Sequence, residues 1–170
     1  MKKKIIYDPY AEILEEFNKR GTRYVVIGMS GINYYASSAS EIFSTQDFDI
    51  LIKPTTTNVE KAILGIKKLG YNLRDAEKEV DESDVGDIVR SKSTIICVNE
   101  YYITVELILN VSGFTFDQME LDSRTFVVNN VPIKVGNLKK LLLSKKIAGR
   151  EKDKLFLKRF EILLKEKKVS

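Results

Sequence analysis

A short acidic segment, Thr45–Ile52, constrains the fold of this chain more than any other part of the sequence. Acidic and apolar residues alternate in it and then give way to an apolar run, a pattern that predicts a β-strand. Because side chains along a strand point alternately to opposite faces, Asp47 and Asp49 should share one face. Phe48 and Ile50 should then point to the other face, toward a hydrophobic core.

Two carboxylates on one face of a strand lie about 7 Å apart and repel each other. Solvent, protonation or a divalent cation relieves this repulsion. Hard oxygen ligands suit Mg²⁺, which proteins commonly hold through one or two carboxylates together with substrate phosphates. On this segment alone, the alternative is an edge strand whose acidic face is simply wet.

Length and composition are those of one globular domain. The 170 residues are 44% hydrophobic, enough for a sizeable core. We therefore interpret residues 1–170 as a single domain in which residues 138–168 form a basic helical segment. No apolar run is long enough to span a membrane, and the basic start, Met1–Tyr7, is too short for a signal peptide. The lone cysteine, Cys97, lies in an apolar run, so we expect a buried core residue, no internal disulfide and a cytoplasmic protein.

The sequence contains no histidine, which excludes Ser-His and Cys-His nucleophilic pairs and histidine-ligated zinc. Acid–base or metal chemistry therefore has to use carboxylates, supported by Lys, Arg, Tyr or Ser. Charge is divided unevenly, because residues 138–170 hold twelve Lys/Arg and four Asp/Glu, a net +8, while residues 1–137 carry −4. The basic segment suits a polyanion such as a nucleotide or RNA, or else it is a solvated lysine-rich helix face.

Capping residues and apolar periodicity predict the helices. The first should begin after Asp8, with Pro9 in its first turn, and should end at Gly21. The others are a short helix at 32–36, a helix capped by Thr57 or Asn58 and ended by Gly70, a helix capped by Asn137 and ended by Gly149, and a last helix from about 151 to 167.

β-branched and apolar runs predict five further strands. They are residues 24–27, a pair at 93–98 and 101–109 joined by a two-residue turn at Asn99–Glu100, and a hairpin of 124–129 and 130–135 with Asn129–Asn130 in its turn. Residues 37–44 should form a loop and the acidic residues 74–87 a solvated excursion. The order of elements predicts an α+β fold, a mixed sheet packed by helices.

Gly28–Gly31 follows a buried strand directly and precedes the short helix at 32–36. A glycine lets backbone N–H groups approach an anion, and a helix N-terminus is positive, so Gly28 is a candidate phosphate-binding residue. Ser30 could add a hydroxyl. The alternative is an ordinary tight turn between strand and helix.

Glu106 is a lone acid inside the apolar run Thr104–Leu109. A central strand rarely buries a single carboxylate without a partner. If this strand neighbours the strand of Asp47 and Asp49, three carboxylates converge. Three acids without histidine fit a two-metal site for phosphoryl transfer.

Together these pieces resemble the DNA polymerase β-type nucleotidyltransferase superfamily, and within it the small bacterial and archaeal nucleotidyltransferases, a group that includes abortive-infection toxins. Its signature is a strand, a Gly-Gly or Gly-Ser turn, a helix, an Asp-hydrophobic-Asp strand and a third acid on a later strand. The run Lys145–Asp153 is a second match, because it resembles the Lys-x-x-Ala-Gly-Arg-x-Lys-Asp run of this group. The order of motifs holds from Val25 to about Leu164.

The resemblance implies an enzyme that moves a nucleoside monophosphate from a nucleoside triphosphate to a hydroxyl of RNA, a protein or a small molecule. It assigns Asp47 and Asp49 to two Mg²⁺ ions, for which Mn²⁺ can substitute. Glu106, as the third acid, would help to hold one metal and take the proton of the acceptor.

The resemblance also assigns roles on the phosphate side. Gly28 and Ser30 would hold the β- and γ-phosphates through backbone and hydroxyl donors. Lys145 and Arg150 would neutralise phosphate charge or touch the acceptor. Alternatively, Arg150 and Asp153 simply cap and brace the last two helices.

Two departures from the signature leave a second hypothesis open. Met29 replaces the second Gly or Ser of the turn, and the loop around residues 37–40 is longer than usual. Under this hypothesis the chain is a catalytically degenerate binding module of the same fold, either antitoxin-like or RNA-binding through its basic end.

Overall fold

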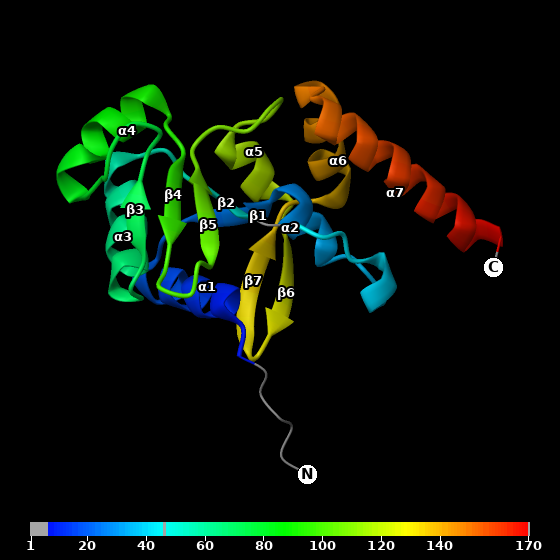
Figure 1. Ribbon diagram of the computed structural model, residues 1–170, viewed down its shortest axis with the longest axis horizontal. Coiled ribbons are helices and arrows are strands. Elements are labelled where there is room, and N and C mark those ends of the chain that lie inside the picture. The colour runs from blue at the N-terminus through cyan, green and yellow to red at the C-terminus, as the bar shows by residue number, and fades with distance from the viewer. Residues whose placement is uncertain (1–6, 46, 170) are drawn as a thin grey trace, which may run out of the picture.

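The computed structural model describes residues 7–45 and 47–169, and these form an α+β fold built on a seven-stranded mixed sheet (Figure 1). The predicted fold class is therefore confirmed. The strand order is β3-β4-β5-β2-β1-β7-β6. The strands are β1 (Tyr24–Ile27), β2 (Phe48–Ile52), β3 (Asn72–Arg74), β4 (Ile95–Val98), β5 (Thr104–Ile108), β6 (Arg124–Val128) and β7 (Val131–Val135).

Helices cover the sheet and extend beyond it. Helix α1 packs against α3 and β7, α2 packs against β1 and β2, and α6 packs against α2 and α7. In Figure 1, α7 continues away from the sheet toward the C-terminus. The helices are α1 (Pro9–Arg20), α2 (Gly28–Asn33), α3 (Thr56–Lys68), α4 (Val85–Ser91), α5 (Phe116–Leu121), α6 (Leu138–Ala148) and α7 (Glu151–Val169), with 3₁₀ turns at Ala39–Glu41 and Glu82–Asp84. No helix in the described ranges is long and apolar enough to cross a membrane.

The central strands β1 and β2 are buried on both faces. Every residue of β1 is buried, and in β2 only Asp49 is more than slightly exposed. Strand β2 pairs antiparallel with β1 and parallel with β5. Because a shift of one residue would turn Asp49 into the core and an apolar neighbour out of it, burial holds this carboxylate at one place.

Several predicted boundaries are confirmed. The side chain of Asp8 accepts hydrogen bonds from the N–H groups of Tyr10 and Ala11, and Gly21 ends α1 in the left-handed conformation. Asn137 caps α6, and Gly149 ends it. The hairpin of β6 and β7 turns at Asn129–Asn130, where both residues have positive φ, as a type I′ turn requires.

Other boundaries differ from the sequence prediction. The cap of α3 is Thr55, two or three residues before the predicted one, because its hydroxyl accepts the N–H of Asn58. The turn between β4 and β5 runs over residues 99–103 rather than two residues, since the Asn99 side chain accepts the N–H groups of Tyr101 and Ile103. The excursion at 74–87 includes the end of β3, a 3₁₀ turn and the start of α4, and its apolar residues Val80 and Val85 are buried.

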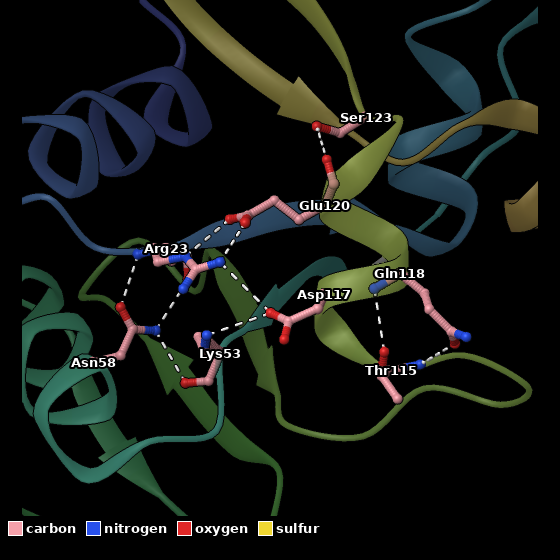
Figure 2. Close-up of polar contacts among 8 residues, drawn as sticks. All are labelled: Arg23, Lys53, Asn58, Thr115, Asp117, Gln118, Glu120 and Ser123. Atoms are coloured by element: carbon pink, nitrogen blue, oxygen red, sulfur yellow. Dashed lines mark hydrogen bonds and ion pairs between the residues drawn. The ribbon is translucent and has the colours of Figure 1, made fainter.

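Asn58 does not cap α3 because its side chain belongs to a polar network that connects α5 and α3 to the start of β1 (Figure 2). Asn58 accepts the N–H of Arg23 at 2.7 Å and donates to the carbonyl oxygens of Arg23 and Lys53 at 3.0 Å each. The Arg23 guanidinium bonds the Glu120 carboxylate, and Lys53 lies 3.3 Å from Asp117, both acids being on α5. This network lies at the end of β1 and β2 away from Asp49, since Arg23 precedes β1 and Lys53 follows β2.

Candidate active site

Asp49 and Glu106 lie at matched positions on neighbouring parallel strands. The register of β2 and β5 places Asp49 directly opposite Glu106. Directly opposite residues of paired strands point to the same side of the sheet, and neighbouring strands lie about 4.7–4.9 Å apart. The predicted convergence of these two acids is confirmed by the register.

The environment of Asp49 disfavours its charge. Burial, the negative charge of Glu106 and a hydrogen bond to the Glu106 carboxyl raise the pKa of Asp49 from 3.8 to about 7. The Oδ1 atom of Asp49 is buried and accepts no hydrogen bond from any described residue. The site therefore holds a carboxylate oxygen that lacks a partner. Leaving a buried acceptor unsatisfied costs about 1–3 kcal/mol of stability.

The backbone at the junction of β1 and α2 packs against the Asp49 carboxylate. Gly28 has φ of +66°, and a Cβ added there would overlap Asp49 Oδ2. Only glycine combines this backbone conformation with such a close approach. The predicted turn at 28–31 is instead the first part of α2, which begins at Gly28 and ends at Asn33 rather than covering 32–36.

Ser30 lies beneath this site instead of lining it. Its hydroxyl donates to the carbonyl oxygen of Ile27 at 2.8 Å and accepts the N–H of Asp49 at 3.0 Å, and the residue is buried. Both bonds are to backbone groups, so Ser30 ties α2 to β2 at the position of Asp49. The assignment of this hydroxyl to a phosphate stays a prediction.

Contrary to the sequence prediction, Asp47 does not lie within β2 together with Asp49. The strand begins at Phe48, so Asp47 lies just before it and is exposed, whereas residue 46 of the predicted strand lies outside the described residues. Phe48 and Ile50 are buried in the core as predicted. Asp47 nevertheless lines the same cavity as Asp49 and Glu106.

The three acids form one wall of a cavity of about 620 Å³. A second wall comes from α6 and the start of α7, where the polar lining residues are Ser144, Lys145, Arg150, Lys152 and Asp153. Residues after β5 close one side, since the Ser144 hydroxyl donates to the carbonyl oxygen of Ser112 at 2.8 Å. The cavity therefore has an acidic wall on the sheet and a mainly basic wall on the helices.

Lys145 and Arg150 are brought together by Asp153. Lys145 Nζ lies 3.5 Å from Asp153 Oδ1, and Arg150 Nε lies 2.7 Å from Asp153 Oδ2. Burial lowers the pKa of Lys145, and the charge of Asp153 opposes this shift. Sequence reasoning treated Asp153 only as a helix brace; its position in the run Lys145–Asp153 was the one available signal for a role at the cavity.

Two comparisons with known proteins gave matches to this chain. A family model described as "Nucleotidyl transferase of unknown function (DUF2204)" matches residues 7–170. The chain belongs to this nucleotidyl transferase family. The crystal structure of the lincosamide antibiotic adenylyltransferase LnuA, bound to lincomycin, is similar in fold, with a TM-score of 0.60 at 14% identity over 94% of this chain and 98% of that one. No curated protein matches the sequence. The finer resemblance to the abortive-infection toxin group stays a prediction.

The acids of this nucleotidyl transferase family member fit a divalent cation. Three observations support the fit: the donors are hard carboxylate oxygens, Asp49 Oδ1 has no partner, and Asp49 and Glu106 repel each other unless a proton or cation lies between them. Among residues 7–45 and 47–169, no three His, Cys, Asp or Glu side chains form a metal-binding group by themselves. The predicted convergence of three acids into one metal-binding group is therefore not seen among the described residues, and Mg²⁺, which can keep water and substrate phosphates among its ligands, stays a prediction.

Proposed function

We propose that this protein is a Mg²⁺-dependent nucleotidyltransferase that moves a nucleoside monophosphate from a nucleoside triphosphate to a hydroxyl acceptor. The observation that carries the proposal is the pairing of Asp49 with Glu106 at a cavity whose other wall is basic. Family membership supports the reaction class, and the acidic wall supports the use of a metal.

The roles of the acids follow from their positions. Asp47, Asp49 and Glu106 would hold Mg²⁺, which when bound neutralises phosphate oxygens and stabilises the charge that develops during transfer. Asp49 is fixed by the register of β2 and by the Ser30 hydroxyl on its N–H, so its carboxylate needs little reorganisation to act as a ligand. Mn²⁺ would serve at the same oxygens.

The bond changes define the reaction. The acceptor oxygen forms a bond to the α-phosphorus, the bond from that phosphorus to the α–β bridging oxygen breaks, and pyrophosphate leaves. The proton of the acceptor hydroxyl passes to Glu106, the acid beside Asp49 on β5. No change of oxidation state occurs, so the nucleotide and the acceptor are the only reactants.

The helical wall has the charge that phosphates require. Lys145, Arg150 and Lys152 line it together with the single acid Asp153. A triphosphate placed between the two walls would meet metal on the sheet side and ammonium or guanidinium groups on the helix side. The backbone N–H of Gly28 would be a further donor for its β- and γ-phosphates, as the resemblance implies.

Thermal unfolding with each of the four nucleoside triphosphates, with and without Mg²⁺, tests nucleotide binding. A ligand at about 100 times its dissociation constant stabilises the folded state by roughly 2.7 kcal/mol, a shift of several degrees for a chain of this size. A Mg²⁺-dependent shift with one nucleotide identifies the substrate. The absence of a shift with all four would favour a binding module of the same fold.

Labelled nucleotides test the reaction class. The protein is incubated with the nucleotide so identified, labelled at the α- or the γ-phosphate, and with RNA, protein and small-molecule fractions of a cell extract. Transfer of the α-label but not of the γ-label is expected. Transfer of the γ-label would identify a kinase and contradict the proposal.

A further inference from the structure

Asp153 is a buried carboxylate between two cations on the helical wall of the cavity. Only 1% of its side chain is exposed, compared with 13% for Lys145 and 59% for Arg150. Burial alone would raise the pKa of Asp153, but the hydrogen bond from Arg150 and the charge of Lys145 hold it below its usual value. Asp153 therefore carries its negative charge inside the wall.

A helix brace explains the contact with Arg150 but not the contact with Lys145. Arg150 and Asp153 are three residues apart at the start of α7, where such pairs stabilise a helix end. Lys145 comes from the last turns of α6, and its ammonium also lies 5.0 Å from the ring centre of Phe156. Two contacts from α7 thus hold the end of a long flexible side chain that lines the cavity.

The cluster of Lys145, Arg150 and Asp153 can still bind an anion. One carboxylate faces two cations, so a net charge of +1 remains on this part of the wall. A lysine ammonium has three N–H donors, and Asp153 is the single acceptor described for it. The charge of Asp49 also acts on Lys145, which puts the ammonium within electrostatic reach of the acidic wall.

We propose that Asp153 is a positioning residue that holds the Lys145 ammonium at the cavity as the donor for the phosphate chain of the substrate. This inference rests on the proposed function and assigns to Asp153 a role beyond bracing the helices. Lys145 contacts the phosphates, and Asp153 acts only through Lys145. Without the carboxylate, the Phe156 ring is the one described contact left for the Lys145 ammonium, and part of the binding energy is lost to ordering this side chain.

A double-mutant cycle on Asp153→Asn and Lys145→Met tests this role. Calorimetry measures binding of inorganic triphosphate in Mg²⁺, which isolates the phosphate chain from the base. Each single variant is expected to weaken binding about tenfold, as for loss of one charged hydrogen bond. The double variant is expected to bind no more weakly than Lys145→Met, because the proposal routes the effect of Asp153 through Lys145 and not through its other partner, Arg150. The matched control is Glu151→Gln, which removes an exposed acid from the same helix turn and should bind as the wild type does.

Kinetics of transfer give a second measurement. Asp153→Asn should raise the KM for the nucleoside triphosphate with a smaller effect on kcat, since an interaction with the phosphate chain is made already in the bound state. If Asp153→Asn does not fold, Phe156→Leu replaces it, because this change removes the ring beside the ammonium and leaves both charges in place; binding about threefold weaker is expected.

Two results would overturn the inference while leaving the proposed function intact. In the first, Asp153→Asn binds triphosphate as tightly as the wild type while Lys145→Met does not. In the second, the two single effects add in the double variant. If wild-type protein binds neither inorganic triphosphate nor any nucleoside triphosphate in Mg²⁺, the proposed function fails and the inference fails with it.

Discussion

Asp49 on β2 and Glu106 on β5 are paired residues of two parallel strands, so their side chains lie next to each other on one face of the sheet. Their sequence separation is large, yet the sheet register leaves no freedom in their pairing. On its other side Asp49 lies opposite Ile27 of β1, and a side chain on the next residue, Gly28, would overlap its carboxylate. The close approach of two like charges is unfavourable without a ligand, and it is the feature from which most of the following predictions derive.

The raised pKa of Asp49 predicts a specific dependence of stability on pH. Its pKa is about 7 when folded and about 3.8 when unfolded, so its contribution to stability is present below pH 4 and is lost as the pH rises to 7. An asparagine side chain does not titrate, so Asp49→Asn should not lose this stability as the pH rises. In EDTA, the free energy of unfolding of Asp49→Asn relative to wild type should rise by about 1–3 kcal/mol between pH 5 and pH 8. Urea unfolding at both pH values measures it, and a difference independent of pH would contradict the assignment.

Asp47→Asn should separate metal binding from stability. Asp47 is exposed and lies before β2, so its replacement should change the free energy of unfolding by less than about 0.5 kcal/mol. It should nevertheless abolish the Mg²⁺-dependent shift produced by the nucleotide. Differential scanning fluorimetry measures both effects on one sample. A retained shift would remove Asp47 from the metal site.

Gly28→Ala should damage the site far more than a glycine change with the same backbone strain. Gly28 and Gly21 have nearly equal φ, +66° and +67°, but a Cβ at Gly21 meets no atom within 4 Å. Gly21→Ala should therefore lose about 1 kcal/mol of stability and keep activity. Gly28→Ala should lose at least as much stability and most of the activity, because the new Cβ displaces the Asp49 carboxylate. Equal activity of the two variants would show that the close approach to Asp49 is unimportant.

Ser30→Ala tests the anchor beneath Asp49. The change leaves the N–H of Asp49 without its acceptor, and we expect a loss of about 1–3 kcal/mol in the free energy of unfolding together with weaker Mg²⁺-dependent nucleotide binding. Ser40→Ala is the control, because Ser40 is exposed in the 3₁₀ turn before β2. If Ser30→Ala lowers nucleotide affinity without any loss of stability, the hydroxyl acts on the phosphate directly and the anchor assignment is wrong.

The sequence was informative where burial and capping act locally. The alternation around Asp47 and Asp49 predicted the core positions of Phe48 and Ile50, and Asp8 and Asn137 marked helix starts because short polar side chains satisfy free N–H groups there. Glu106 was singled out because an acid in an apolar strand needs a partner. That partner proved to be Asp49.

The sequence was misleading where tertiary contacts decide. Asn58 has the side chain of a cap, but its amide bonds the backbone of Arg23 and Lys53, and Thr55 caps α3 instead. Nothing in the sequence indicated that the Ser30 hydroxyl bonds two backbone groups of neighbouring elements; its assignment to a phosphate stays a prediction. Helix α5 was missed because its six residues are too few to show periodicity.

The most direct test of the central claim is the affinity for the nucleoside triphosphate, measured by calorimetry with and without Mg²⁺, for wild type, Asp49→Asn and Glu106→Gln. If the paired acids hold the metal through which the nucleotide binds, Mg²⁺ tightens binding to the wild type about a hundredfold and has little effect on either variant, a difference of about 2.7 kcal/mol. If Mg²⁺ affects all three proteins equally, Asp49 and Glu106 do not form the metal site, and the account of this cavity as a nucleotidyltransferase centre is contradicted.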